Sequence, residues 1–507
     1  MSAAPGSSSG GSRRPESRLG TLMPLARLNQ KIAVSVVYVA ALFMAIMDST
    51  IVNVALPTLG REFHTSTDAV DGVVIAYLVS LAVFIPTSGW LGDRLGGRRV
   101  LLGSIVLFAA ASALCGTATS LGELVAFRVL QGIGGGLMTP VGMAMLWRVF
   151  PPAERVRASG LLVIPTALAP AVGPVLGGLL VTDVSWRWVF YVNVPIALAA
   201  LAFGLACLHD QRLDHSGPFD PRGFLLSGAG LGLLMYGVSE GPIKGWARPQ
   251  IVASCAAGAA LLVIFAAIEL RTRDPLLNLR LLRDRLFATS NGVMLLASVS
   301  FIGVIYLVAL FYQDGLGLSA LQSGLSTFPE AIGVMLGAQF TAKLLYPVLG
   351  PRRLMSAGLV VVAAGMASLL AIGDGTSLWW ARLVLFVIGL GMSGVFIPTQ
   401  TAAFATISND DMGSASTLFN TQRQLGGAVG VAFLTTVLAA VGPFSHLSGH
   451  AAPNLGAYRT AFLTAVVIAL LGAGLALRIH DEDAASTITR WRRRAPASGL
   501  GGRAEDA

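Results

Sequence analysis

The stretch GWLGDRLGGRRV, from Gly89 to Val100, combines glycines and charges in a way that indicates a tight connection between two helices. Its glycines permit close helix approach, and Gly96 with its neighbour allows a tight turn. Asp93 stands at the expected end of the preceding helix. The same stretch carries three arginines that can hold a neighbouring helix terminus: Arg94, Arg98 and Arg99.

Long apolar runs lie on both sides of this stretch and recur along most of the 507-residue chain. Hydrophobic residues make up 54% of the chain and charged residues 12%, whereas soluble domains average about 25% charged. The mean hydropathy is +0.72. Each run is long enough, at roughly 1.5 Å per residue, to cross a hydrocarbon core of about 30 Å. The sequence therefore predicts an integral membrane protein.

We predict fourteen transmembrane helices, because runs of this length without alternation do not fit the short alternating strands of a membrane barrel. The fold class is all-α. The expected spans are 32–57, 70–91, 100–120, 123–147, 158–182, 187–208, 222–240, 250–270, 287–312, 321–345, 354–373, 379–402, 416–441 and 459–479.

Basic residues indicate the orientation of these spans. If both tails are cytoplasmic, the cytoplasmic segments hold most of the 35 Lys and Arg residues, as the positive-inside rule requires. The opposite side then holds only Arg61, Arg187, Lys244, Arg248, Arg382 and Arg459. The net charge of +9 follows from this topology, so nucleic acid is not an expected partner.

The chain is expected to comprise two six-helix halves joined by a central helix pair. The expected parts are a disordered cytoplasmic tail (1–31), the first six-helix half (32–208), a two-helix linker (209–285), the second six-helix half (286–480) and a cytoplasmic tail (481–507). The N-terminal tail is rich in Gly, Ser and Pro and has too little apolar surface to fold.

Two further spans combine small residues with special chemistry. In ELVAFRVLQGIGGGLMTP, Arg128, Gly132 and Gly136 recur every four residues, so an arginine shares a face with a glycine groove. An arginine at membrane depth costs roughly 2.5 to 3.5 kcal/mol on insertion scales, so it should not face lipid. In GLLVIPTALAPAVGPVLGG (160–178), small residues at four-residue spacing and three prolines favour close packing of a bent helix.

These stretches resemble known transporter motifs. GWLGDRLGGRRV resembles the loop signature of the major facilitator superfamily, with a weaker echo in GAQFTAKLLYPVLGPRRL, and the fifth span resembles the signature shared by antiporters of that superfamily. MDSTIVNVALP, SWRWVFYVNVPI and GSASTLFNTQRQLGGAVG resemble stretches of its fourteen-span drug:proton antiporters. An ordinary small-residue packing helix is the alternative for the fifth span. The resemblance implies the major facilitator fold and drug export coupled to protons.

Asp48, within MDSTIVNVALP, is the candidate for proton coupling. It shares a helical stripe with small residues, which places it toward other helices. A carboxylate kept from bulk water binds a proton more readily, whereas a nearby cation favours its ionised form. Arg128 is the expected partner, because the family fold packs the first and fourth spans together. The alternative is a permanent ion pair that only fastens two helices.

Glu330, in STFPEAIGV of the tenth span, is the second acid at membrane depth. By helical rise it lies roughly 14 Å from the outer end of its span, near the midplane where transporter substrates bind. It is a candidate for proton or cation binding. The alternatives are a structural pair with Arg423 and a conformation that reaches water.

The remaining candidates form two groups. Residues expected to line the substrate cavity are Asn53, Tyr77, Tyr306, Tyr312, Gln313, Gln400, Asn420 and Arg423. Residues expected to govern conformational change are Gly89, Asp93, Arg94, Gly96, Arg98, Gly132, Gly160, Gly173, Pro174, Gly177 and Gly178.

The predicted function is proton-coupled export of lipophilic or cationic drugs or antibiotics by alternating access. An exporter of one endogenous metabolite or lipid, or a proton-coupled uptake permease, is the alternative. Since the sequence contains no P-loop or HExxH motif, we expect no enzyme activity, no metal and no cofactor beyond the proton gradient. We expect a monomer in a bacterial inner membrane, with lipid, protons and a small molecule as its partners.

Overall fold

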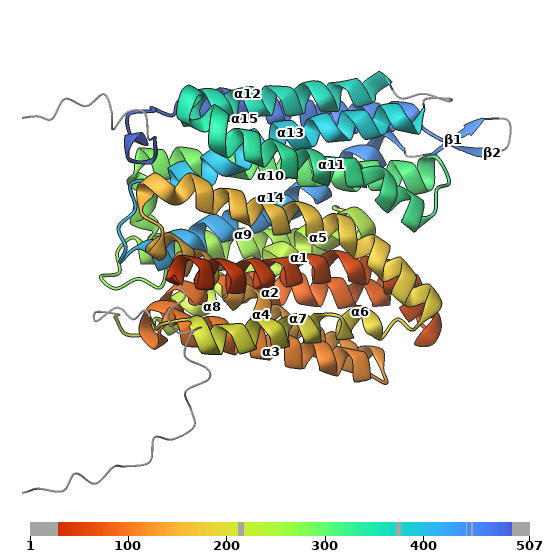
Figure 1. Ribbon diagram of the computed structural model, residues 1–507. Coiled ribbons are helices and arrows are strands. Elements are labelled where there is room, and N and C mark those ends of the chain that lie inside the picture. The colour runs from red at the N-terminus through yellow and green to blue at the C-terminus, as the bar shows by residue number, and fades with distance from the viewer. Residues whose placement is uncertain (1–28, 211–216, 372–376, 443, 448–449, 489–507) are drawn as a thin grey trace, which may run out of the picture.

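The computed structural model describes residues 29–210, 217–371, 377–442, 444–447 and 450–488. The expected tails therefore fall mostly outside the described residues. Within these ranges the chain forms fifteen α-helices and one two-stranded hairpin. Long helices lie side by side as a bundle (Figure 1).

The first helices follow the apolar runs of the sequence. Their bounds are α1 (Gln30–Glu62), α2 (Thr67–Leu95), α3 (Gly97–Thr117), α4 (Leu121–Val149), α5 (Arg155–Asp183), α6 (Trp188–Tyr191), α7 (Asn193–Cys207), α8 (Pro221–Lys244) and α9 (Pro249–Glu269). The expected span 187–208 is thus divided into the short α6 and α7.

The later elements include six long helices and the hairpin. Their bounds are α10 (Arg285–Leu310), α11 (Ala320–Phe340), α12 (Tyr346–Ser368), α13 (Leu378–Ala403), α14 (Met412–Val441), β1 (Phe444–Leu447), β2 (His450–Pro453) and α15 (Leu455–Ala476). Strands β1 and β2 pair antiparallel. Two π-helical turns, Phe311–Gly315 and Thr341–Leu345, extend α10 and α11.

Twelve described stretches are long and apolar enough to span a membrane. One of them, Gln322–Ala371, has 50 residues and covers α12 and nearly all of α11. The chain leaves helical geometry there at Gly350, whose φ of 73° favours glycine. Fourteen spans result only when this stretch is divided and the 24-residue α8 is added, so the count stays a prediction.

The two sets of helices α1–α7 and α10–α15, called here the first and second halves, repeat one packing pattern. In the first half α1 packs against α5, α2 and α3 against α4, and α7 against α1 and α3. In the second half α10 packs against α14, α11 and α12 against α13, and α15 against α10 and α12. The helix pair α8–α9 packs together and contacts α2 and α14 through α8.

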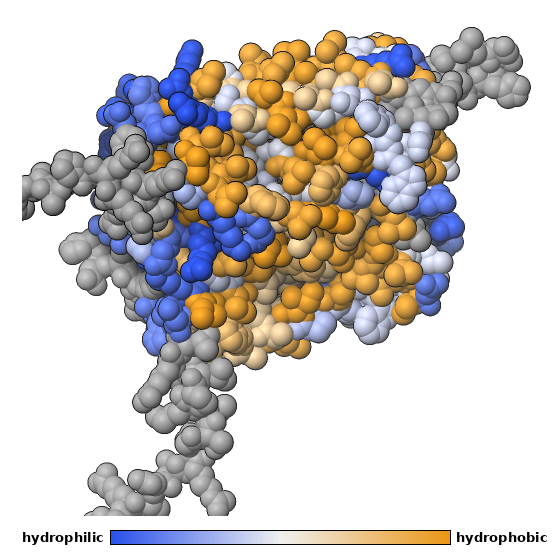
Figure 2. Space-filling model, turned by 45° about the horizontal axis from the view of Figure 1, so that its top comes forward, coloured by the Kyte–Doolittle hydropathy of each residue, from blue (hydrophilic) through white to orange (hydrophobic). Residues whose placement is uncertain are grey.

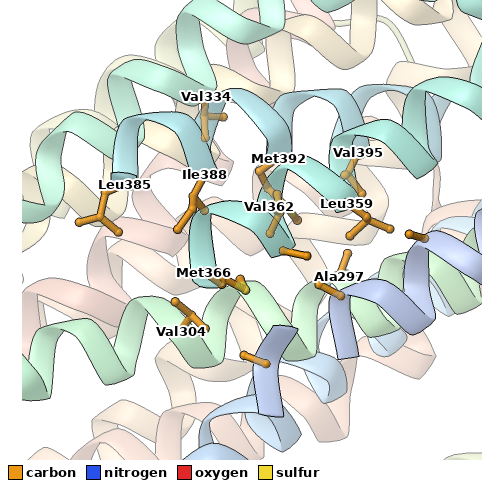
Figure 3. Close-up of a cluster of buried hydrophobic side chains, with 14 of the residues drawn as sticks. Ala297, Val304, Val334, Leu359, Val362, Met366, Leu385, Ile388, Met392 and Val395 are labelled. Atoms are coloured by element: carbon orange, nitrogen blue, oxygen red, sulfur yellow. The ribbon is translucent and has the colours of Figure 1, made fainter. Parts of the chain in front are cut away.

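Apolar side chains fill the interior and also form a belt around the outside. In the second half, buried residues of α10, α11, α12 and α13 meet in one cluster, including Val304, Val334, Met366 and Ile388 (Figure 3). Outside, large apolar side chains such as Val263 are exposed (69%), and Figure 2 shows an apolar belt between two hydrophilic ends. This distribution fits a protein surrounded by hydrocarbon.

The bundle has two ends, which we call the terminal end and the hairpin end. Helix α1 begins and α15 ends at the terminal end, whereas β1 and β2 project from the hairpin end (Figure 1). Beyond α15, the chain packs back onto α12. The Asp481 carboxylate accepts the backbone N–H of Arg352 at 2.9 Å, and the hydroxyls of Thr487 and Tyr346 are 2.7 Å apart.

Candidate functional site

Asp48 lies at the centre of a buried polar network in the first half. Its Oδ2 accepts a hydrogen bond from Nη1 of Arg128 at 2.5 Å. Its Oδ1 accepts amide N–H bonds from Gln131 and Asn193, both at 2.8 Å. The side chains of Asp48 and Arg128 are 0% exposed. The carboxylate thus accepts three hydrogen bonds, one of them from a charged donor.

Arg128 is held on all sides by protein. Its Nε donates to the backbone carbonyl of Val73 at 3.2 Å, and Nη1 also donates to Oε1 of Gln131 at 2.7 Å. The guanidinium carbon lies 4.2 Å from the ring centroid of Tyr77. These contacts replace the water that the cation loses at membrane depth. The arginine does not face lipid, as the sequence indicates.

The network is not fully satisfied. Among the described residues, Nη2 of Arg128 and Oδ1 of Asn193 have no hydrogen-bond partner. Buried polar groups without partners are uncommon in proteins and need a reason, such as a water or a functional role. Both oxygens of the Asp48 carboxylate thus accept hydrogen bonds. By contrast, Nη2 of Arg128 has no acceptor and Oδ1 of Asn193 has no donor.

Glycines on α4 and α5 allow the close packing that builds this network. A Cβ at Gly132 would lie 2.6 Å from the carbonyl oxygen of Tyr77 on α2. A Cβ at Gly177 would lie 3.0 Å from the carbonyl oxygen of Ile51 on α1, and Gly173 meets Thr50 one turn away. Real Cβ atoms do not tolerate such distances, so these glycines set the spacing of the helices.

The remaining residues of the fifth-span motif lie differently. A Cβ added at Gly160 would lie 3.8 Å from the Cβ of Ala342 in the second half. Pro174 lies beside Gly324 of α11. Gly178 has no neighbouring atom within 4 Å of such a Cβ. Therefore Gly160 and Pro174 lie where α5 meets the second half, while Gly178 faces open space.

A cavity of about 40 Å³ lies between the two halves. Its wall comes from α1, α4 and α5 on one side and from α10, α13 and α14 on the other. Three residues predicted for the substrate cavity lie on this wall: Gln400, Asn420 and Arg423. Tyr38 of α1 lies there too, ten residues or roughly 15 Å of helix before Asp48.

The other residues predicted for the substrate cavity lie elsewhere. Tyr77 is buried against Arg128, and Tyr312 is buried in the core of the second half. Tyr306 is 43% exposed, and Asn53 and Gln313 are exposed. In this conformation none of these five side chains lines the central cavity.

Glu330 is half-buried on α11. Within the described ranges, no hydrogen bond or ion pair engages its carboxylate, and none joins it to Arg423. The alternative of a structural ion pair between Glu330 and Arg423 is therefore wrong for this conformation, because the two side chains form no ion pair. Among the described residues no cluster of His, Cys, Asp or Glu could hold a metal ion.

The stretch GWLGDRLGGRRV forms the terminal ends of α2 and α3. Asp93 pairs with Arg148 at 2.6 Å, and Arg148 also donates to the backbone carbonyl of Asn409 in the second half at 3.2 Å. Gly96 has a φ of 95° between the two helices. Arg98 donates to the carbonyl of Leu205 at 2.8 Å, and Arg94 is exposed.

This stretch contributes to closing the terminal end of the bundle. Helix α2 meets α14 so closely that a Cβ at Gly89 would lie 2.9 Å from the carbonyl oxygen of Gly413. The hydroxyls of Ser88 and Thr417 are 3.1 Å apart across the same contact. Nearby, Arg155 donates to the carbonyl of Phe404. Hydrogen bonds therefore join the two halves at the terminal end, on that side of the central cavity.

Three members of the polar network were not among the sequence candidates: Gln131, Asn193 and Ser112, whose hydroxyl contacts both amides at 3.1 Å. A signal existed for two of them. Gln131 follows Arg128 by three residues on the same helical face, and Asn193 is a polar residue within an apolar run. Ser112 had no such signal, because serine is common in spans.

Comparisons with known proteins show the family to which the chain belongs. Residues 38–431 match the family model described as Major Facilitator Superfamily. The chain is 34% identical to the Multidrug resistance protein B homolog of Mycobacterium tuberculosis (strain ATCC 25618 / H37Rv), over 79% of this chain and 75% of that protein. It is 34% identical to the Tetracenomycin C resistance and export protein of Streptomyces glaucescens, over 78% and 74%.

Two further matches cover more of each chain. The Puromycin resistance protein pur8 of Streptomyces alboniger is 31% identical over 88% of this chain and 91% of its own. The crystal structure of the human organic anion transporter MFSD10 (TETRAN) has a TM-score of 0.63, at 18% identity, over 88% of this chain and 99% of that chain. That likeness concerns the fold alone. The chain thus belongs to the major facilitator superfamily, and its relatives there include multidrug and antibiotic resistance proteins.

Proposed function

We propose that this protein is a proton-coupled antiporter that exports small drug-like compounds by alternating access. The observation that carries the proposal is the fully buried Asp48, paired with Arg128 and bound by two amides at membrane depth. Ionisable groups at this depth are costly, and in transporters they mark ion and substrate pathways. The resistance and export named for the relatives make drug export the favoured direction.

In this proposal, a proton that binds Asp48 removes the charge that holds Arg128. The guanidinium then loses its counter-ion and must find other partners, which changes the contact between α1 and α4. Because α1 also forms the wall of the central cavity at Tyr38, this change reaches the substrate. The proton gradient supplies about 2.3 kcal/mol per charge for each 100 mV, plus the pH term.

The contacts at the terminal end define one side of the cycle. By the positive-inside rule this end is cytoplasmic, so the conformation described here is closed toward the cytoplasm. Opening toward the cytoplasm requires the separation of Arg148 from Asn409 and of Ser88 from Thr417. Rocking of the two halves about the central cavity achieves this and is the usual form of alternating access.

Two alternatives remain within the transporter class. An exporter of one endogenous metabolite or lipid would use the same network, and so would an uptake permease working in the opposite direction. The first differs in the breadth of compounds moved. The second differs in the direction of substrate movement, because protons enter the cell in both cases. For Asp48 itself, the alternative is a permanent ion pair that fastens α1 to α4.

The test uses everted membrane vesicles that contain the full-length protein. An imposed pH gradient, acid inside, should drive accumulation of fluorescent drug analogues, and a protonophore should abolish it. Vesicles with Asp48→Asn at equal protein levels should accumulate none. If no compound of a broad panel moves in response to the gradient, the proposal is wrong. Movement of a single compound would favour the metabolite exporter.

A further inference from the structure

The central cavity contains a positive charge without a counter-ion. Arg423 of α14 lies on its wall and is half-buried. Among the described residues its guanidinium forms no hydrogen bond, ion pair or cation–π contact. None of the twelve residues that line the cavity is acidic. Arg423 thus differs from Arg128, whose guanidinium contacts the Asp48 carboxylate, the Gln131 amide, a backbone carbonyl and the ring of Tyr77.

Two hydroxyl donors in the same wall are also unused. The phenol of Tyr38 and the hydroxyl of Ser298 are buried, at 0% and 1% exposure, and neither has a hydrogen-bond partner among the described residues. Together with the guanidinium they line the same cavity, from α1, α10 and α14. Buried donors without acceptors are unfavourable, so a group that accepts from all three would be stabilised.

Three more wall residues are polar: Thr166 and the amides Gln400 and Asn420, whose side-chain carbonyl oxygens have no hydrogen-bond partner among the described residues. The rest of the wall is apolar. It includes Leu42, Met143, Leu162, Met294, Ile302 and Phe396. The cavity of about 40 Å³ has room for roughly three waters. It can therefore admit a small charged group, while the body of a larger compound must occupy the space that opens when the halves separate. A cation, a few donors and an apolar surround fit an acceptor attached to an apolar body.

We propose that the Arg423 cavity binds the oxyanion of an amphipathic organic anion, such as a carboxylate, a sulfonate or an acidic phenol on an aromatic body. This inference rests on the proposed export function and names its substrate class. It departs from the sequence-based expectation of cationic drugs, because a cationic group placed here would meet an uncompensated guanidinium in a site of low dielectric constant.

The proposal has an electrical consequence. An anion that leaves the cell and a proton that enters both move positive charge inward. For any fixed number of protons per cycle, export of a monoanion therefore carries two more positive charges inward than export of a monocation. Export through this cavity should be accelerated by a membrane potential that is negative inside the cell.

The test compares two dyes that share a xanthene core but differ in charge, fluorescein as the anion and rhodamine 123 as the cation. Binding to the purified full-length protein in lipid nanodiscs is measured by fluorescence anisotropy at neutral pH. Fluorescein should bind at least tenfold more tightly than rhodamine 123. Arg423→Gln should weaken fluorescein binding about tenfold or more, and Arg423→Lys should weaken it less.

A matched control is Arg382→Gln, which removes another half-buried arginine of the second half. Arg382 already has partners, since it donates to Ser326 at 3.2 Å and lies 4.8 Å from the ring of Trp379. Its loss should leave fluorescein binding unchanged. A competition experiment needs no variant: octanesulfonate should displace fluorescein from the wild-type protein, whereas octyltrimethylammonium should not.

Transport in proteoliposomes separates this inference from the proposed function. Accumulation of rhodamine 123 but not fluorescein under a pH gradient would overturn the anion site and leave proton-driven export intact. Binding of fluorescein that depends on Arg423, without movement of either dye, would support the site and contradict export. Absence of fluorescein binding, or binding that Arg423→Gln does not change, would overturn the anion site.

Discussion

Replacing Asp48 by asparagine tests the buried network most directly, because it keeps the size of the side chain and removes its charge. One carboxylate oxygen accepts from Gln131 and Asn193, and the other accepts from Arg128. Whichever way the asparagine is turned, its NH₂ group faces at least one of these donors. The variant therefore loses a hydrogen bond as well as the counter-ion of Arg128.

The magnitude follows from the complete burial of the pair. Both side chains are 0% exposed, so water does not screen the remaining charge. Removing one partner of such a pair typically costs about 3 to 5 kcal/mol. We expect Asp48→Asn to lower the free energy of unfolding by this amount. It should also abolish proton-driven accumulation of substrate in everted vesicles, while the protein still inserts into the membrane.

Cys115 provides a local readout of the same change. Its thiol is fully buried and lies 3.7 Å from Oε1 of Gln131. The chain has three cysteines, so Cys207→Ala with Cys255→Ala leaves Cys115 alone. In that background, Asp48→Asn should raise the rate at which a thiol reagent modifies Cys115 at constant pH. Thermal unfolding in detergent measures the accompanying loss of stability.

The control and the refuting result come from two further variants. Glu62 lies on α1, as Asp48 does, and forms an exposed ion pair with Arg187 at 3.5 Å. Glu62→Gln breaks this pair and should change neither readout, because exposed pairs contribute little. Asp48→Asn combined with Arg128→Gln removes both charges. If the pair only fastens helices, this double variant should regain stability and transport. Full proton-driven uptake in the double or the single variant would refute the coupling role of Asp48.

Three other perturbations follow from the geometry. Gly177→Val should lower thermal stability by about 1 to 3 kcal/mol through overpacking against α1, whereas Gly178→Val, which meets no atom, should leave the unfolding temperature unchanged. Asp93→Asn should weaken closure of the terminal end, seen as faster modification of a Thr417→Cys thiol, which is otherwise buried. Glu330→Gln should not destabilise the protein, because no partner is lost, yet should alter the pH dependence of uptake if Glu330 binds protons.

Much of the fold could be predicted from the apolar runs. The expected span 123–147, for example, lies within α4, Leu121–Val149. Local breaks could not be predicted. The division between α6 and α7 falls beside Asn193 in an otherwise apolar stretch, and one polar residue does not by itself indicate a break. The π-helical turn Thr341–Leu345 needs one extra residue in a helical ladder, for which the sequence carries no signal. The hairpin depends on pairing of β1 with β2 rather than on an alternating pattern.

The site was predictable where the cost of burial forces a residue to face protein. Asp48 and Arg128 had to find partners, and the family resemblance placed their helices together. The orientation of aromatic and amide residues was not determined in this way. Tyr306 is tolerated on an exposed face, whereas Tyr38 is buried in the cavity wall. Which face of a helix meets lipid, cavity or neighbour depends on how the halves pack.

The packing of α1 explains how a proton could act on the distant cavity. Asp48 and Tyr38 stand on the same helix, roughly 15 Å apart, and that helix meets α5 at Gly173 and Gly177 without room for a methyl group. Helix α5 in turn packs against α11 of the second half. Since close-packed interfaces switch between discrete arrangements rather than deform continuously, α1 cannot shift alone when Arg128 loses its counter-ion. It must move with α5, and the contact of α5 with α11 then carries the shift into the second half.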